Sequence, residues 1–174
     1  NIRIIDNPEQ HLATALNIAV TEAKGDIFLR LDAHASCRND FIRRSVESLI
    51  SHEADFVGPV LNIVPANDSI IAKCITFVWA HPLGAGTAPY KQKWQSWKGP
   101  KSVPTAPYGC MHHSIFRRVG TYDEELTRSS DLDFSRRVTA SGGTILLDPN
   151  IVVEYHARGN FQALASHAFA NGTM

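Results

Sequence analysis

The sequence lacks an excess of charge of either sign, because its 174 residues carry 17 lysines and arginines against 17 aspartates and glutamates. A nucleic-acid-binding domain usually shows a basic excess or a basic stripe, so this balance argues against one. No apolar run reaches the roughly 18 residues that a membrane-spanning helix needs. The first residues also lack the basic and apolar pattern of a signal peptide.

Cysteine is scarce as well. The chain contains Cys37, Cys74 and Cys110, an odd number at wide spacing, which favours reduced, buried thiols in a cytoplasmic protein over a disulfide framework or a zinc site. The other proportions, 44% hydrophobic and 20% charged, are those of an ordinary globular domain, so a disordered chain, a collagen and a coiled coil are excluded. Because strand-like residues open the chain and a helix-like pattern ends it, we expect a piece of a longer protein.

The first thirty residues predict a βαβ unit. Residues 2–5 are apolar and strand-like, and residues 8–24 have apolar side chains at helical spacing between Pro8 and Gly25. Residues 26–31 form a second apolar run, which predicts a strand buried on both faces. Two strands joined through a helix should be parallel, so the sequence predicts an α/β fold with a mostly parallel sheet flanked by helices.

The rest of the chain continues this alternation within a single domain, residues 1–174. The predicted helices are one that begins near Asp40 and those at 69–79, 114–119, 131–141 and 161–170, and the predicted strands are 55–64, 144–147 and 151–155.

Residues 82–107 break the pattern and predict a long loop. Loops of this size in compact domains tend to be functional or disordered. This one is a lid over an anionic or sugar ligand, or a solvated loop with two aromatic anchors, and the composition favours neither. The side chains concerned are Lys91, Lys93, Trp94, Trp97, Lys98 and Lys101.

Asp32 and His34 directly follow the predicted strand 26–31. In open α/β sheets ligands bind beyond the carboxyl ends of the strands, and residues two apart at a strand end point the same way. A carboxylate and an imidazole suit a divalent cation such as Mn²⁺ or Mg²⁺. The alternative, a turn-forming Asp32 and a surface His34, is equally compatible with this spacing.

A second acidic group, Asp131 and Asp133, lies in the first turn of a predicted helix, after Ser129 and Ser130. Carboxylates there are stabilised by the helix dipole, and a serine caps the helix, which is the simpler explanation. In the functional alternative one carboxylate acts as a general base towards a hydroxyl nucleophile.

The histidines predict no closed zinc site, since His112 and His113 lack the spacing of a zinc pair on a helix. His156 ends a predicted strand, where it could reach a metal or a diphosphate, although a single histidine is more often an ordinary surface or core residue.

The order of motifs resembles inverting glycosyltransferases of family 2, which have the GT-A fold, and among them the glucosyltransferases of succinoglycan-type exopolysaccharide synthesis. The similarity covers residues 1 to about 170, with the 82–107 loop poorly matched. The matching residues are Ile5-Asp6-Asn7-Pro8, Ala15-Leu16-Asn17, Ala23-Lys24-Gly25-Asp26, Arg30-Leu31-Asp32-Ala33-His34, Gly109, Phe116 to Leu126, Asp131-Leu132-Asp133 and Ser141-Gly142-Gly143.

The resemblance implies a role for each matching position. Asp131 corresponds to the catalytic base that deprotonates the acceptor hydroxyl, although Ser130 stands where the family commonly has a preceding acid. Asp32 and His34 correspond to the first and third positions of the Asp-x-Asp motif. His34 departs from the motif at the third position, which binds the metal. The implied metal ligands are Asp32, His34 and His156, and the implied substrate-binding residues are Asp32, Gly109, His112, His113, Asp133 and Arg158.

The resemblance also implies a nucleotide-sugar donor, with a UDP-sugar expected, and a saccharide or lipid-linked acceptor. His112 and His113 occupy the place of a basic pair, so their acceptor-side charge would depend on pH. Family members begin with two further strands that bind the nucleotide. Because these are missing from the 174 residues, we expect a GT-A-like domain without its first strands, cytoplasmic, whose parent supplies any membrane association.

Two other functions compete with transfer. The first is a non-catalytic carbohydrate- or nucleotide-binding fragment of such an enzyme, which Ser130 favours and the joint retention of Asp32, His34 and Asp131 opposes. The second is a metal-dependent phosphohydrolase that uses Asp32, Asp131 and Asp133, which would need a further clustered carboxylate.

Overall fold

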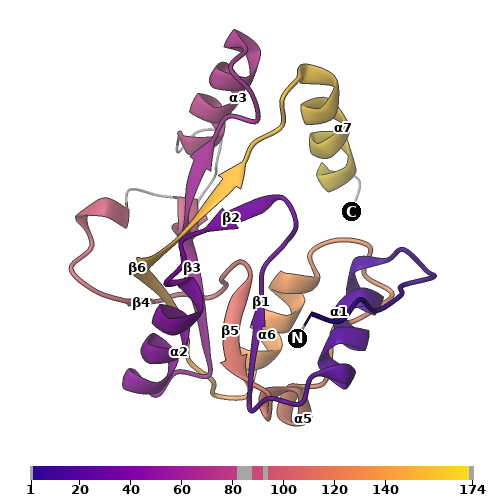
Figure 1. Cartoon of the computed structure of the whole chain (residues 1–174), viewed down its shortest axis with the longest axis vertical. Coiled ribbons are helices and arrows are strands. Elements are labelled where there is room, and N and C mark those ends of the chain that lie inside the picture. The colour runs from indigo at the N-terminus through magenta and orange to yellow at the C-terminus, as the bar shows by residue number, and fades with distance from the viewer. Residues whose placement is uncertain (1, 82–87, 92–93, 173–174) are drawn as a thin grey trace.

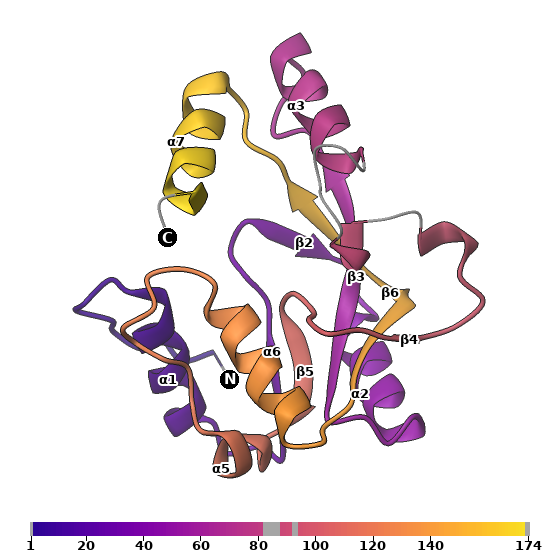
Figure 2. The same cartoon turned by 180° about the vertical axis from the view of Figure 1, so that it is seen from behind.

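A computed structural model describes residues 2–81, 88–91 and 94–172 of the chain. The helices are α1 (Leu12–Glu22), α2 (Phe41–Ser51), α3 (Ile70–Ala80), α5 (Ile115–Val119), α6 (Ser130–Ala140) and α7 (Phe161–Gly172). A central sheet separates α2 on one face from α1, α5 and α6 on the other, while α3 and α7 stand together at one end (Figures 1 and 2). The predicted α/β class with helices on both faces is therefore confirmed.

The sheet is mixed, so the prediction of mostly parallel pairing is wrong. Its strands are β1 (Ile27–Arg30), β2 (Ala35–Cys37), β3 (Phe56–Val64), β4 (Lys101–Ser102), β5 (Gly109–His112) and β6 (Ile145–His156). They follow the order β1-β5-β3-β6-β2, with β4 paired to β6, and among these pairs β3 with β6 is parallel while the others are antiparallel. Strands β1, β3 and β6 do run in one direction, but the short strand β5 separates β1 from β3.

The predicted first strand does not form, since residues 2–5 have no regular secondary structure. Ile2 and Ile4 are each 97% exposed, so an apolar run alone did not bring this segment into the sheet. Arg3 instead pairs with Glu22 at 3.2 Å on the surface. The first helix begins at Leu12, and β1 alternates half-buried with buried residues where burial on both faces was expected.

The two strands predicted near the C-terminus are one strand, β6. Its register against β3 shifts between Pro59 and Val60, where Pro59 faces Asp148 and Val60 faces Val152. The extra residues of β6 form a bulge that contains Pro149, and β6 remains paired with β3 on both sides of it. The Asp148 carboxylate accepts a hydrogen bond from the backbone N–H of Asn150 at 2.9 Å, which forms a local turn at the bulge.

A hydrophobic core lies on each face of the sheet. The first contains Leu16 of α1, Phe116 of α5 and Phe134 of α6, which pack on Phe28 and Phe56 of the sheet. The second is formed by α2 against the other face, and its buried members are Phe41, Leu49, Ala54, Val57, Leu61, Tyr108, Cys110, Leu146, Ile151, Val153 and Tyr155. Fully burying one such side chain contributes about 1.5–3 kcal/mol, so the helices are fixed mainly by these contacts.

The described part of the 82–107 loop is anchored to the domain. It contains the short 3-10 helices η1 (Pro89–Lys91) and η2 (Trp94–Ser96), and Trp94 Nε1 donates to the Leu61 carbonyl at 3.2 Å. The ammonium of Lys101 lies 4.4 Å from the Trp97 ring. Aromatic anchors are therefore present, whereas the lid function stays a prediction, and Lys93 lies outside the described residues.

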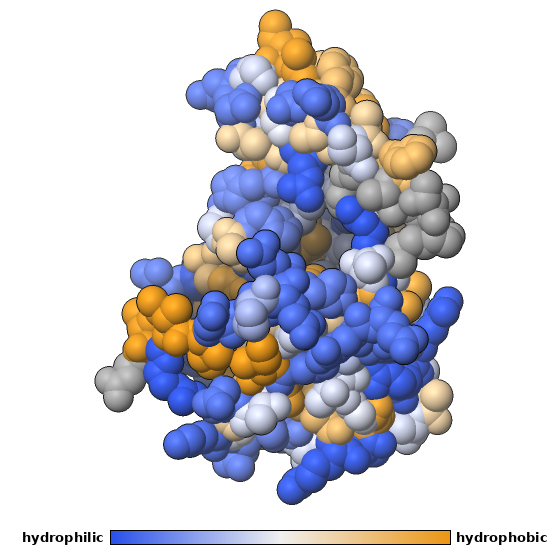
Figure 3. Space-filling model, turned by 90° about the vertical axis from the view of Figure 1, so that its right-hand side faces the viewer, coloured by the Kyte–Doolittle hydropathy of each residue, from blue (hydrophilic) through white to orange (hydrophobic). Residues whose placement is uncertain are grey.

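The expectation of three buried thiols is right for Cys110 and wrong for Cys37 and Cys74, which are exposed. Within residues 2–81, 88–91 and 94–172, no helix combines the length and apolar character needed to cross a membrane. Figure 3 shows hydrophobic residues at the upper tip of the molecule and a hollow between this end and the lower part.

Candidate active site

One buried arginine joins two acidic residues that are far apart in the sequence. Arg30, the last residue of β1, has a side chain only 5% exposed. Its Nε donates to Asp32 Oδ1 at 2.7 Å and its Nη2 to Asp32 Oδ2 at 3.0 Å. Its Nη1 donates to Oδ1 of Asp131, the second residue of α6, which lies 101 positions further along the chain. Asp32 and Asp131 therefore belong to one site.

The arginine is buried in its charged form because the two carboxylates compensate for the loss of water. Burial alone would lower the pKa of Arg30, but Asp131, and then Asp32, outweigh it and the pKa is raised. A guanidinium presents several donors in a fixed plane, so it can hold both carboxylates at once. The three groups carry a net charge of −1 (one guanidinium and two carboxylates).

Asp131 is anchored on one side and open on the other. Its side chain is 42% exposed and borders a cavity of about 350 Å³. The remaining lining residues of this cavity are Tyr90, Thr105, Ala106, Pro107, Ser129 and Leu132. The protein around the carboxyl raises its pKa, although Arg30 opposes that shift. A carboxylate with a raised pKa, beside a cavity, can accept a proton from a hydroxyl group.

The start of α6 differs in detail from the predicted cap. Ser129 is the residue before the helix, as expected, but its φ is 61° and its side chain makes no capping hydrogen bond. Asp131 and Asp133 both lie in the first turn, where the helix dipole favours negative charge. Asp133 is paired with Arg137, whose Nε donates at 2.9 Å, so this predicted substrate-binding carboxylate already has a partner within its own helix.

A second group of predicted residues surrounds Tyr155 of β6. The His34 ring packs edge-on against the Tyr155 ring at 5.0 Å, and Trp79 stacks on the same ring at 5.7 Å. Burial raises the pKa of Tyr155, while the charge of Arg158 lowers it and that of Asp32 raises it. Among the predicted residues, His34 is therefore in contact with this tyrosine, and Asp32 and Arg158 act on it through their charges.

The predicted metal ligands do not form a ready-made metal site. Both oxygens of Asp32 are bonded to Arg30, and His156 Nε2 lies 3.2 Å from the Ser36 hydroxyl. Among the described residues, no three histidines, cysteines or acidic residues are grouped so that they could hold a metal ion. His34, exposed in the turn after β1, is the predicted ligand with no polar side-chain partner in the described part of the chain.

Gly109 has a packing role in this structure. It faces Arg30 in the β1–β5 register, its φ is 125°, and an added Cβ would lie 1.8 Å from Cε2 of Phe56. A side chain at this position would therefore collide with the core.

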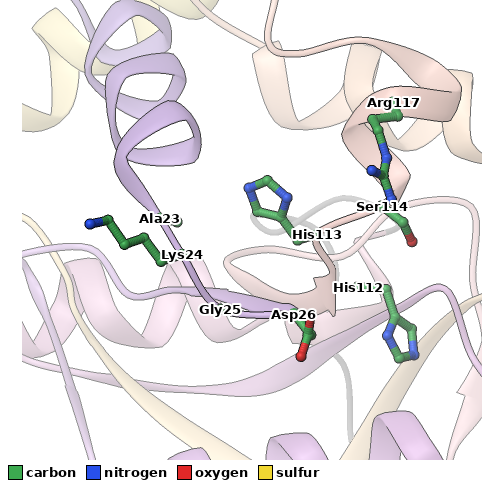
Figure 4. A pocket seen from close by; sticks show the side chains of 8 residues that line it. All are labelled: Ala23, Lys24, Gly25, Asp26, His112, His113, Ser114 and Arg117. Carbon is green, nitrogen blue, oxygen red and sulfur yellow. The ribbon is translucent and has the colours of Figure 1, made fainter.

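His112 and His113 lie at the opposite end of β5 from the carboxylates. His112 faces Ile27, three residues before Arg30, which corresponds to about 10 Å along a strand. They line a separate cavity of about 290 Å³ together with Lys24, Asp26 and Arg117 (Figure 4). In this view the side chains diverge, and His113 Nε2 approaches the Val20 carbonyl at 3.0 Å. The structure thus does not bring the histidine pair to Asp131.

Arg30, Tyr155 and Tyr90 are site residues that the sequence interpretation did not select. Arg30 had a usable signal, because a charge within an apolar strand must find a buried partner. Tyr155 and Tyr90 had none, since aromatic residues in a strand or a loop are usually packing residues.

The chain shares its mixed α/β sheet with helices on both faces with solved GT-A structures, so its fold is of the GT-A type. It belongs to glycosyl transferase family 2, whose family profile matches residues 1–120. The resemblance inferred from the motif order is therefore confirmed at the level of fold and family, while the roles of single residues remain predictions.

The chain is similar to two characterised proteins along nearly its whole length. It is 27% identical to the succinoglycan biosynthesis protein ExoA of Rhizobium meliloti (strain 1021), over 98% of this chain and 51% of that protein. It is 24% identical to a dolichyl N-acetyl-alpha-D-glucosaminyl phosphate 3-beta-D-2,3-diacetamido-2,3-dideoxy-beta-D-glucuronosyltransferase of Methanococcus voltae, over 99% of this chain and 53% of that protein. The chain spans about half the length of these relatives.

Solved structures share the fold at lower identity. GalNAc-T7, crystallised with UDP, GalNAc and Mn²⁺, superposes with a TM-score of 0.62 at 16% identity, over 89% of this chain and 32% of that one. TarS 1–349 of S. aureus superposes with a TM-score of 0.60 at 12% identity, over 87% and 42% of the two chains. At such identities the likeness supports the fold alone.

Proposed function

We propose that this chain carries the catalytic core of an inverting glycosyltransferase, which moves a sugar from a nucleoside-diphosphate donor to a saccharide or lipid-linked acceptor in polysaccharide synthesis. The observation that carries the proposal is the position of Asp131. Its carboxylate is anchored to Arg30 on one side and borders a cavity of about 350 Å³ on the other. A general base needs this combination of a fixed position and open access.

The chemistry is one displacement at the anomeric carbon. Asp131 takes the proton of the acceptor hydroxyl while the hydroxyl oxygen forms a bond to that carbon. The bond from the carbon to the diphosphate oxygen breaks, and its electron pair leaves on the nucleoside diphosphate. One base on the side opposite the leaving group is sufficient, and the configuration of the sugar is inverted.

The donor side of this proposal is the region around Tyr155. Arg158 is half-buried there and positively charged, and therefore suits a diphosphate. A UDP-sugar is the donor we propose, and UDP is also the nucleotide named for two of the structural neighbours, GalNAc-T7 and TarS. The predicted ligands of Mn²⁺ or Mg²⁺ are not assembled among the described residues, and His34 is an exposed one of them that could accept a cation.

The acceptor side is the cavity beside Asp131. Tyr90 and Leu132 give it an apolar wall, on which the face of a sugar ring can pack. The names of the two relatives, one in succinoglycan biosynthesis and one a glucuronosyltransferase for a dolichyl-linked sugar, support a saccharide or a lipid-linked saccharide as acceptor.

The test combines binding with turnover. Calorimetric titration of UDP in the presence of Mn²⁺ should show binding to the protein and to an Asp131→Asn variant alike. Transfer from a UDP-sugar should be abolished by the variant, because an amide cannot take the proton. The matched control is Asp68→Asn, an exposed aspartate beside Lys73, which should keep wild-type turnover.

Two results would contradict the proposal. Retained turnover in Asp131→Asn would exclude Asp131 as the base. Binding of UDP without transfer in the wild-type protein, across a panel of sugar donors and acceptors, would favour the alternative of a non-catalytic binding domain.

A further inference from the structure

The guanidinium of Arg30 uses all three of its nitrogens on the two carboxylates of the site. Its Nε and Nη2 donate hydrogen bonds to the two oxygens of Asp32, and its Nη1 donates one to Oδ1 of Asp131. Among the described residues, Asp131 Oδ2 has no hydrogen-bond partner. One oxygen of the base is thus fixed and the other remains available to a hydroxyl group in the cavity.

We propose that Arg30 is the positioning residue of the transfer reaction: it keeps Asp131 ionised and aims its free oxygen at the acceptor, with the same guanidinium that fixes Asp32. This inference rests on the proposed function of Asp131 as the base. Arg30 itself lies behind the carboxylates, with its side chain only 5% exposed, so its effect reaches the acceptor through Asp131.

The physical reason is that the surroundings of Asp131 otherwise favour its neutral form. Burial of the carboxyl raises its pKa, and the negative charge of Asp32 raises it further. A base that is protonated at working pH cannot accept the acceptor proton. An opposite charge in contact lowers the pKa of an aspartate by about 1–3 units, so Arg30 opposes these two effects, and without it the pKa of Asp131 would be higher still.

Three tyrosines also interact electrostatically with Asp131. They are Tyr90 of η1, which borders the same cavity, Tyr108 just before β5, and Tyr122 in the segment between α5 and α6. Burial raises the pKa of each, to about 12 for Tyr122, so they stay neutral in the pH range where an aspartate titrates. Arg30 is therefore the cation in contact with Asp131 among the described residues.

The shared guanidinium also distinguishes arginine from lysine at this position. A lysine would supply the charge but only one nitrogen, which cannot hold two carboxylates in one plane. We expect Arg30→Lys to keep the pH dependence close to that of the wild-type protein and to lose kcat. Arg30→Met keeps much of the side-chain length without charge, and should lose kcat and also shift the pH dependence.

The experiment measures the pH profile of transfer and the titration of Asp131 itself. In Arg30→Met, the acid limb of kcat/KM should move to higher pH by about 1–3 units, with the dissociation constant for UDP changed less than kcat. The ¹³C carboxyl resonance of Asp131, assigned by its loss in Asp131→Asn, should show the same upward shift. Arg44→Met, which breaks the Arg44–Asp40 contact of 2.7 Å at the start of α2, should change neither the acid limb nor the Asp131 resonance.

The outcomes separate the two proposals, because the resonance of Asp131 can be followed without turnover. If Arg30→Met loses activity while the midpoint of the acid limb and the Asp131 titration stay at their wild-type pH, Arg30 is merely structural and the inference is wrong. If the wild-type protein transfers no sugar, the proposed function fails, and the titration still decides whether Arg30 controls the ionisation of Asp131. Should Arg30→Met not fold, Arg30→Lys decides: kcat equal to that of the wild-type protein overturns the inference.

Discussion

Replacing Gly109 with alanine distinguishes a packing role from a substrate-binding role at this position. Two costs are visible in the structure. The φ of 125° lies in a region that residues with a Cβ rarely adopt, and the new Cβ would lie 1.8 Å from one Phe56 ring carbon and 2.5 Å from another. Both costs arise inside a core where Phe56 is 2% exposed.

The expected loss of stability is the sum of these costs. A strained backbone conformation costs about 1–3 kcal/mol, and forcing an extra carbon into a packed core costs about 1–3 kcal/mol. Gly109→Ala should therefore lower the free energy of unfolding by about 2–6 kcal/mol, a large share of the 5–15 kcal/mol typical of a domain. Urea unfolding followed by circular dichroism measures this loss as a lower midpoint.

Two other glycines serve as matched controls. Gly142 has a φ of 81° and no atom within 4 Å of an added Cβ, so Gly142→Ala tests the backbone cost alone, about 1–2 kcal/mol. Gly99 has neither feature, and Gly99→Ala should leave the stability unchanged or slightly higher. If Gly109→Ala unfolds at the wild-type urea concentration but binds UDP more weakly, the packing explanation is wrong and the predicted substrate contact is favoured.

Three further predictions concern the site and the thiols. Tyr90→Ala should raise the KM for the acceptor about five- to tenfold by removing one aromatic contact, and leave UDP binding unchanged. If kinetic assays show that the KM rises equally for donor and acceptor, the cavity is not an acceptor site. His34→Ala should weaken Mn²⁺ binding in calorimetry with UDP present, and unchanged binding would remove His34 as a ligand. Cys37 and Cys74 should react with a thiol reagent in the native protein, and Cys110 only after denaturation. Burial raises the pKa of the Cys110 thiol to about 12, so its reactive thiolate would form only as the pH approaches that value. A third fast-reacting thiol in the native protein would contradict this prediction.

The helices were predictable from the sequence because their signals are local. Apolar spacing identified α1, α2, α3, α6 and α7 to within a few residues, and Ser69 caps α3 as such residues commonly do, accepting a hydrogen bond from the Ala72 N–H at 3.1 Å. The strand pairing was less predictable. β5 has only four residues, and its place between β1 and β3 depends on contacts with segments more than 50 residues away.

The site was predictable in part for the same reason. Asp32 and Asp131 carry local signals, a strand end and a helix start, and both are hydrogen-bonded to Arg30 in the structure. The predicted metal ligands are not gathered among the described residues, and nothing in their spacing shows that Arg30 is bonded to both oxygens of Asp32. His112 and His113 are separated from Asp131 by the direction of β5, which runs antiparallel to β1 and carries them to the far end of the sheet.

The position of Arg30 depends on the backbone of Gly109. Among the described residues β1 pairs only with β5, and Arg30 and Gly109 face each other in that pairing. Because Gly109 has no side chain, the Phe56 ring can lie against β5 at this point and close the core under Arg30. A Cβ there would displace the ring or the strand, and a displaced β1 would move the guanidinium that holds Asp131. We therefore expect Gly109→Ala to lose kcat together with stability, although Gly109 itself contacts no substrate; a variant that lost stability and kept full kcat would show that Arg30 is held independently of β5.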